Sequence, residues 1–114
     1  MTETELQTAL AKRLKEMRIF FEYTQKGLAR QSGLSINTIY KLEHGKTKIH
    51  ATTYEKLHDA LCVDYKDFFE FDKPLDADLL LKHINRYTNK LTSKERFMAH
   101  HLLHCMVKLA VLQR

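Results

Sequence analysis

Apolar residues recur every three or four positions along most of the chain. Near the N-terminus, Leu10, Leu14, Met17 and Phe21 follow this spacing, which predicts one amphipathic helix over residues 4–22. The polar faces of that helix are expected to carry four charged side chains: Lys12, Arg13, Lys15 and Glu16.

Two much shorter helices are predicted next. Thr24 is a favourable N-cap, and Gly33 is suited to end the helix in a left-handed conformation. Ser35 then caps a third helix, which Gly45 ends. The residues expected to face inward from the two helices are Leu28, Ala29, Ile39 and Leu42.

The same spacing predicts four more helices. One covers residues 53–61, and Asp64 caps a short one with the sequence YKDFFEF. Another begins at Asp76 or Asp78, and the last runs from about 93 to 113 behind Thr92 and Glu95, which form a capping-box pattern. No strand-like alternation or internal repeat is present, so the pattern predicts an all-α protein.

The only proline, Pro74, lies in the sequence FDKPLDAD and predicts a domain boundary there. We expect residues 1–71 to form one domain and residues 72–114 a helical C-terminal region, with a helical hairpin over 76–113. The last helix is apolar nearly all round, which predicts burial on several sides. We interpret it as a dimerisation surface whose contacts would come from Leu102, Met106, Leu109 and Leu112.

Composition narrows the class of protein. The formal net charge is +5, and between Gln25 and His50 five Lys and Arg side chains face a single acidic one, Glu43. This local excess favours a polyanionic partner. The two cysteines do not form a C-x-x-C pair, which argues against a disulfide framework. The sequence has no signal-peptide pattern and no apolar run of roughly 18 residues, so we expect a cytoplasmic protein without a membrane anchor.

Residues 10–71 resemble the Cro and lambda-repressor-type helix-turn-helix family, often called the XRE family. Each piece of the motif is short, but the pieces occur in the family's order and spacing. They are Leu14 and Arg18, Thr24-Gln25 with Leu28-Ala29, Gly33, Ser35 with Ile39, and Leu42-Glu43-His44-Gly45-Lys46. The resemblance implies a five-helix lambda-repressor-like DNA-binding domain followed by the C-terminal hairpin.

The resemblance also implies roles for individual residues. The third helix would lie in the DNA major groove, and the base-reading candidates on its outer face are Ser35, Ile36, Asn37 and Lys41. The phosphate-binding candidates are Gln25, Thr38, Tyr40, His44, Lys46 and Lys48. Arg18 and Glu43 match the two positions that the family joins in a partly buried salt bridge, so we interpret them as structural rather than catalytic.

The sequence HHLLHC, from His100 to Cys105, is the other chemical candidate. His100 and His104 share a helix face, and such a pair can bind a transition metal, but the further ligands that a site needs have no counterpart elsewhere. Histidines at a helix–helix interface, with or without pH sensitivity, are the alternatives. We therefore expect no catalytic residue, no metal and no cofactor, and we interpret Cys62 as a buried structural thiol.

Together these features predict a sequence-specific regulator that binds double-stranded DNA. We expect a repressor that binds a palindromic operator as a homodimer. The alternative is an antitoxin-type protein, whose C-terminal helices bind a toxin while the helix-turn-helix autoregulates. The sequence does not decide whether the chain also binds a protein partner or a small-molecule inducer. It also does not decide between repression and activation.

Overall fold

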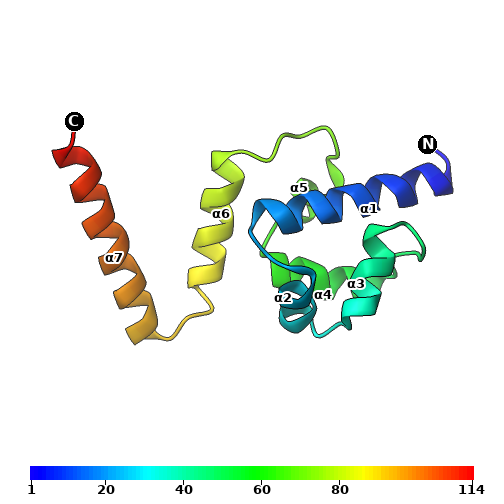
Figure 1. Ribbon diagram of the computed structural model, residues 1–114, viewed down its shortest axis with the longest axis horizontal. Coiled ribbons are helices and arrows are strands. Elements are labelled where there is room, and N and C mark those ends of the chain that lie inside the picture. The colour runs from blue at the N-terminus through cyan, green and yellow to red at the C-terminus, as the bar shows by residue number, and fades with distance from the viewer. The chain divides into compact units, whose positions relative to one another are not determined.

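The computed structural model describes all residues from 1 to 114 and contains seven α-helices and no strand (Figure 1). The predicted all-α class is confirmed. The helices are α1 (Glu3–Phe20), α2 (Gln25–Ser32), α3 (Ile36–Glu43), α4 (Ala51–Leu61), α5 (Tyr65–Phe69), α6 (Ala77–Thr88) and α7 (Ser93–Leu112).

The chain forms two compact units, Met1–His83 and Ile84–Arg114. We call the first the head and the second the tail. The division falls within α6, twelve residues beyond the boundary predicted next to Pro74. The reason is that Leu79 and His83 of α6 are buried with the head.

Several helix starts follow from short-range side-chain bonds that the sequence predicts. The hydroxyl groups of Thr24 and Ser35 accept hydrogen bonds from the N–H groups of Gly27 (2.9 Å) and Thr38 (3.0 Å). Such caps satisfy N–H groups that the helix itself cannot. Asp64 is the N-cap of α5 but makes no capping bond, and α4 begins two residues earlier than predicted.

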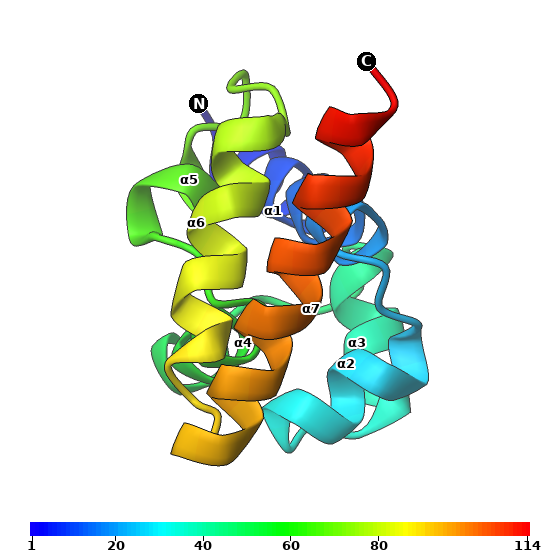
Figure 2. The same cartoon turned by 90° about the vertical axis from the view of Figure 1, so that its left-hand side faces the viewer.

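The head has one apolar core around which α1 to α5 are arranged (Figures 1 and 2). Each helix contributes the residues that its periodicity places on one side. They include Leu14 and Met17 of α1, Leu28 of α2, Ile39 and Leu42 of α3, Leu57 and Leu61 of α4, and Phe68 of α5. Cys62, at the C-cap of α4, is also buried, as predicted.

Arg13 departs from the prediction that it lies on a polar face of the first helix, because only 2% of its surface is exposed. Its guanidinium donates to the carbonyl oxygen of Asp67 at 2.7 and 3.2 Å and to that of Lys73 at 2.8 Å. These bonds satisfy carbonyl groups at the end of α5 and in the following loop, so Arg13 joins α1 to both. Burial lowers the pKa of Arg13.

The same region holds a partly buried ion pair. Lys73 donates to the carboxylate of Asp67 at 2.5 Å, and the Asp67 side chain is almost fully buried. This hydrogen bond raises the pKa of Lys73. The loop after α5 is therefore attached to the head through Arg13 and Lys73.

His83 attaches α6 to the head. Its ring stacks on Phe21, with centroids 4.0 Å apart, and its Nδ1 lies 2.6 Å from the carbonyl oxygen of Leu61. Because a carbonyl only accepts, Nδ1 carries the hydrogen. The first part of α6 thus belongs to the head.

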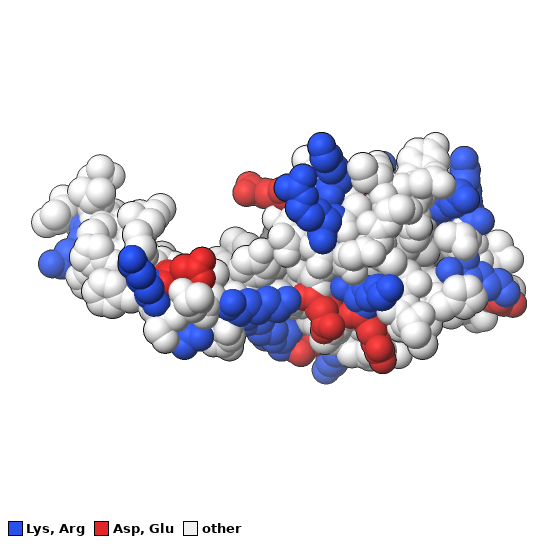
Figure 3. Space-filling model, turned by 90° about the horizontal axis from the view of Figure 1, so that it is seen from below, with Lys and Arg blue, Asp and Glu red and all other residues white.

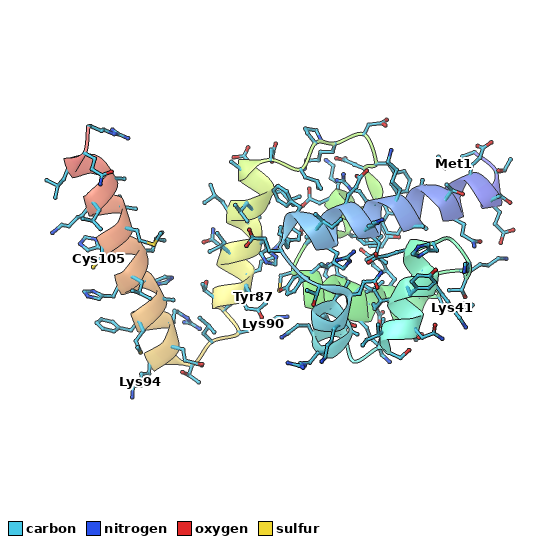
Figure 4. All side chains as sticks on the ribbon, viewed as in Figure 1. Met1, Lys41, Tyr87, Lys90, Lys94 and Cys105 are labelled. Carbon is cyan, nitrogen blue, oxygen red and sulfur yellow. The ribbon has the colours of Figure 1, made fainter.

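The tail contains the last turn of α6, the connection to α7, and α7 itself. Arg96 donates to the carbonyl oxygens of Thr88 and Leu91 in the connection at 3.3 and 3.4 Å. The predicted capping box is present between Thr92 and Glu95, and its hydrogen bonds lower the pKa of Glu95. Tyr87, Lys90 and Lys94 mark this connection in Figure 4.

No residue of α7 is buried. The four residues predicted for a dimer contact are more than half exposed, at 64% for Leu102, 66% for Met106, 60% for Leu109 and 81% for Leu112. A helix with this much exposed apolar surface has a strong tendency to bind another apolar surface.

Candidate nucleic-acid interface

The turn between α2 and α3 is short because a glycine makes it possible. Gly33 has φ 74° and ψ 14°, the left-handed conformation that other residues adopt only with strain. Its N–H and that of Leu34 both bond to the carbonyl oxygen of Ala29, and Ser35 caps α3 directly afterwards. Two helices are thereby joined through a turn of three residues.

The two sides of α3 have different chemistry. Ile39, Leu42 and Glu43 are buried, and Ile39 and Leu42 are part of the apolar core. The opposite side is exposed. It consists of Ile36 and of the residues one, four, five and eight positions after it, which are Asn37, Tyr40, Lys41 and His44. Figure 4 shows Lys41 on the side of α3 that is turned away from α1.

A salt bridge between Arg18 and Glu43 fixes α3 to α1. The Arg18 guanidinium donates from Nε to Oε2 at 2.6 Å and from Nη2 to Oε1 at 3.1 Å, which is a two-point contact. The Glu43 side chain is completely buried and that of Arg18 is 12% exposed. Arg18 also donates to the carbonyl oxygen of Tyr23, so the same side chain ties down the segment before α2.

Gln25 belongs to this network. Its amide Nε2 donates to Oε1 of Glu43 at 3.2 Å, which connects the start of α2 to the end of α3. We predicted Gln25 as a phosphate ligand, and in the structure its side chain has a protein partner. A phosphate at the start of α2 would therefore bind to the backbone N–H groups of the first turn, which have no acceptor within the helix.

Three side chains are stacked at the end of α3. The rings of Tyr40 and His44 lie 3.9 Å apart with an angle of 28° between their planes. The ammonium group of Lys46 lies 5.1 Å from the centroid of the Tyr40 ring. Both cation–π attraction and stacking restrict these side chains before any ligand is present.

Ser35, Thr38 and Lys48 each have a partner within the head. The hydroxyl groups of Ser35 and Thr38 lie 2.7 Å apart, and Ser35 is engaged as the N-cap of α3. Lys48 forms an exposed ion pair with Glu3, which lowers the pKa of Glu3. Exposed pairs of this kind contribute little and can exchange partners, so Lys48 is available to another anion.

Seen from below, the head displays several Lys and Arg side chains, with acidic side chains beside some of them (Figure 3). Along the sequence, the excess of positive charge is concentrated in the segment between Gln25 and His50, where five Lys and Arg residues accompany one acidic residue. It is the electrostatic setting that favours a phosphate backbone.

Two further findings concern metal binding and membrane crossing. No group of three or more His, Cys, Asp or Glu side chains is arranged to hold a metal ion. In the HHLLHC sequence the Sγ of Cys105 and the Nε2 of His101 lie 3.9 Å apart. None of the seven helices combines the length and the apolar character that crossing a membrane requires.

Two short helices joined by a glycine turn, with one side of the second helix exposed, define a helix-turn-helix protein. The comparison with known families agrees, because residues 11–73 match the family model described as a helix-turn-helix domain. The chain belongs to this family, a class of DNA-binding regulators that is not typically enzymatic. No curated protein and no solved structure matches the chain.

Sequence reasoning did not find all the contacts at this surface. It identified Arg18 and Glu43 through the resemblance but assigned Gln25 to phosphate or to a local bond at the helix start, and not to Glu43. It also treated Tyr40, His44 and Lys46 as separate contacts, although the Tyr40 ring contacts both of the others. The spacing of Tyr40 and His44, four residues apart on one helix, was the signal for the stack.

The buried salt bridge generates a stability prediction. Arg18→Met would leave the Glu43 carboxylate buried without its cationic partner, and we expect a loss of about 3–5 kcal/mol in unfolding free energy. The double variant Arg18→Met/Glu43→Met should lose much less. Urea denaturation measures both values.

The control is Lys12→Met, which removes the exposed pair between Lys12 and Glu16. It should cost no more than about 0.5 kcal/mol. If Arg18→Met were as mild as this control, the salt bridge would not be what fixes α3.

Proposed function

We propose that the chain is an XRE-type, sequence-specific transcriptional regulator of the Cro and lambda-repressor kind. It binds a palindromic operator in double-stranded DNA as a homodimer and acts as a repressor. The helix over residues 35–44 lies in the major groove. The observation that carries this proposal is the exposed side of α3, because the rest of that helix is held in the core.

The dimensions of α3 suit this role. Eight residues span about 12 Å, close to the width of the major groove of B-DNA. Asn37 can donate and accept at adenine, and Lys41 can donate to the guanine acceptors. Ile36, which is 48% exposed, can pack against a thymine methyl group. Ser35, beside them, keeps the start of α3 in place and stays the fourth base-reading candidate.

Contacts to the phosphate backbone would set the register of α3 on DNA. Thr38, Tyr40 and His44 lie on or next to the exposed side of α3, and Lys46 and Lys48 follow in the next turn. The start of α2, at Gln25, supplies backbone N–H groups. These positions surround the base-reading residues, as a major-groove contact requires.

A second copy of the chain is the proposed occupant of the apolar surface of α7. Its apolar side chains Leu102, Met106 and Leu109 recur at intervals of four and three, the spacing of a helix–helix seam. Leu103, Val107 and Ala110 extend the surface beyond one seam, so more than one partner helix is needed to cover it. Two heads on one dimer would contact two half-sites about one DNA turn apart.

The exposed surface of α7 also fits the alternative function, an antitoxin whose tail binds a toxin while its head autoregulates. The two proposals differ in what covers α7. Self-association of the pure protein supports the homodimer. A pure protein that stays monomeric, together with a stoichiometric partner in native extract, supports the antitoxin.

The base-reading assignment predicts a loss of discrimination in the double variant Asn37→Ala/Lys41→Ala. Each lost two-point contact to a base is worth about 1–3 kcal/mol, so preference for the cognate site over random DNA should fall by at least tenfold. A competition assay with labelled operator and unlabelled random duplex measures it.

The matched control is Lys12→Ala, which removes a positive charge from α1 and leaves α3 unchanged. It should retain the preference for the operator. Unchanged discrimination in the Asn37/Lys41 double variant, with folding intact, would overturn the assignment of these two residues.

The dimer assignment predicts that Leu109→Asp produces monomers, because the new carboxylate would be buried in the interface at a cost of several kcal/mol. Sedimentation velocity measures the size. Lys108→Asp introduces the same side chain one position away, on the side of α7 that carries His104, and should remain dimeric. If Leu109→Asp remains dimeric like the control Lys108→Asp, the dimer interface does not include Leu109.

A further inference from the structure

We propose that Tyr40, His44 and Lys46 form a phosphate clamp whose hold on DNA strengthens when His44 is protonated. The inference rests on the proposed function and adds to it a role for Tyr40 and a dependence of DNA affinity on pH. The ligand is a backbone phosphate of double-stranded DNA.

The hydrogen bond of His44 fixes which ring nitrogen carries a hydrogen. Nδ1 lies 2.8 Å from the main-chain carbonyl oxygen of Tyr40. A carbonyl oxygen can only accept, so Nδ1 is the donor. In the neutral ring, Nε2 then has a lone pair and no hydrogen.

A phosphate oxygen is also an acceptor, so neutral Nε2 cannot bond to it. Protonation of the ring places a hydrogen on Nε2 and a positive charge on the imidazole, while the Nδ1 bond to Tyr40 is kept. The protonated ring can therefore donate a charge-assisted hydrogen bond to phosphate, which is stronger than a neutral one.

Tyr40 is a positioning residue in this clamp. Its ring stacks on the imidazole at 3.9 Å and lies 5.1 Å from the ammonium of Lys46, so one aromatic ring orients both cations. The turn that carries Lys46 is itself held to α1, because the amide of Gln7 donates to the carbonyl oxygen of Gly45 at 2.7 Å. The clamp is thus restricted before DNA arrives, which reduces the entropy cost of binding.

The charged groups around His44 favour phosphate as its partner. On α3, Lys41 is exposed and Glu43 is buried in its salt bridge with Arg18 of α1. Lys46 follows in the turn, and Glu3 of α1 is paired with Lys48. On α2 the exposed charges are Lys26 and Arg30, both positive.

The direction of the pH effect follows from linkage. DNA binds the protonated ring more tightly, so binding draws a proton onto His44, and affinity rises as pH falls. One charge-assisted hydrogen bond per head corresponds to an expected gain of about tenfold in affinity. A dimer would gain from both heads.

The experiment measures affinity by fluorescence anisotropy at constant ionic strength, from about pH 8 to about pH 5.5. The probe is a labelled duplex of mixed sequence about two helical turns long, because phosphate contacts do not depend on sequence. The variants are His44→Gln, Tyr40→Leu and Tyr40→Phe. The control is His50→Gln, since His50 is exposed and makes no capping bond to α4.

The wild type and His50→Gln should gain about tenfold in affinity or more as pH falls. His44→Gln should lose that gain while keeping its melting temperature. Tyr40→Leu should reduce the gain and Tyr40→Phe should restore it, a rescue that separates positioning from general stability. An unchanged pH profile in His44→Gln would overturn the clamp.

A second measurement needs no variant. In NMR spectra recorded at one pH near neutrality, the signals of the His44 ring should move toward those of the protonated imidazole when duplex is added. No change would contradict the clamp even where DNA binds. If the wild type binds no duplex at any pH, the proposed function itself fails and the clamp fails with it.

Discussion

The two-point salt bridge between Arg18 and Glu43 is the interaction on which the arrangement of the head depends. It joins the end of α1 to the end of α3, and the hydrogen bonds of Arg18 to Tyr23 and of Gln25 to Glu43 connect it to the start of α2. A buried carboxylate is stable only when its oxygens have partners. The three elements that meet at Glu43 are therefore restricted to one mutual position, and the opposite side of α3 is left exposed.

This arrangement separates stability from recognition within one short helix. Ile39 and Leu42 hold α3 in the core, whereas Asn37 and Lys41 make no contribution to that core and can differ without disturbing it. The tail follows the opposite principle, because α7 has no buried residue and its apolar surface depends on something outside the helix. In the proposed function, the first surface meets DNA and the second meets another copy of the chain.

The elements that the sequence predicted well are those with local causes. Thr24, Gly33 and Ser35 act within three or four residues of their own positions, so the turn and the two helix starts could be read from the sequence. Arg13 could not, because the carbonyl group that it satisfies belongs to Asp67, 54 residues further along. The extension of the head to His83 was missed for the same reason, since the ring of His83 meets Phe21 and Leu61 from distant parts of the chain.

The measurement that tests the central proposal most directly is selection of bound sites from a pool of random DNA duplexes. If the exposed side of α3 reads bases from a dimer, the selected pool should contain one short half-site, repeated in inverted orientation with centres about one helical turn apart. A pool that is retained by the protein but stays random in sequence would contradict base reading by α3.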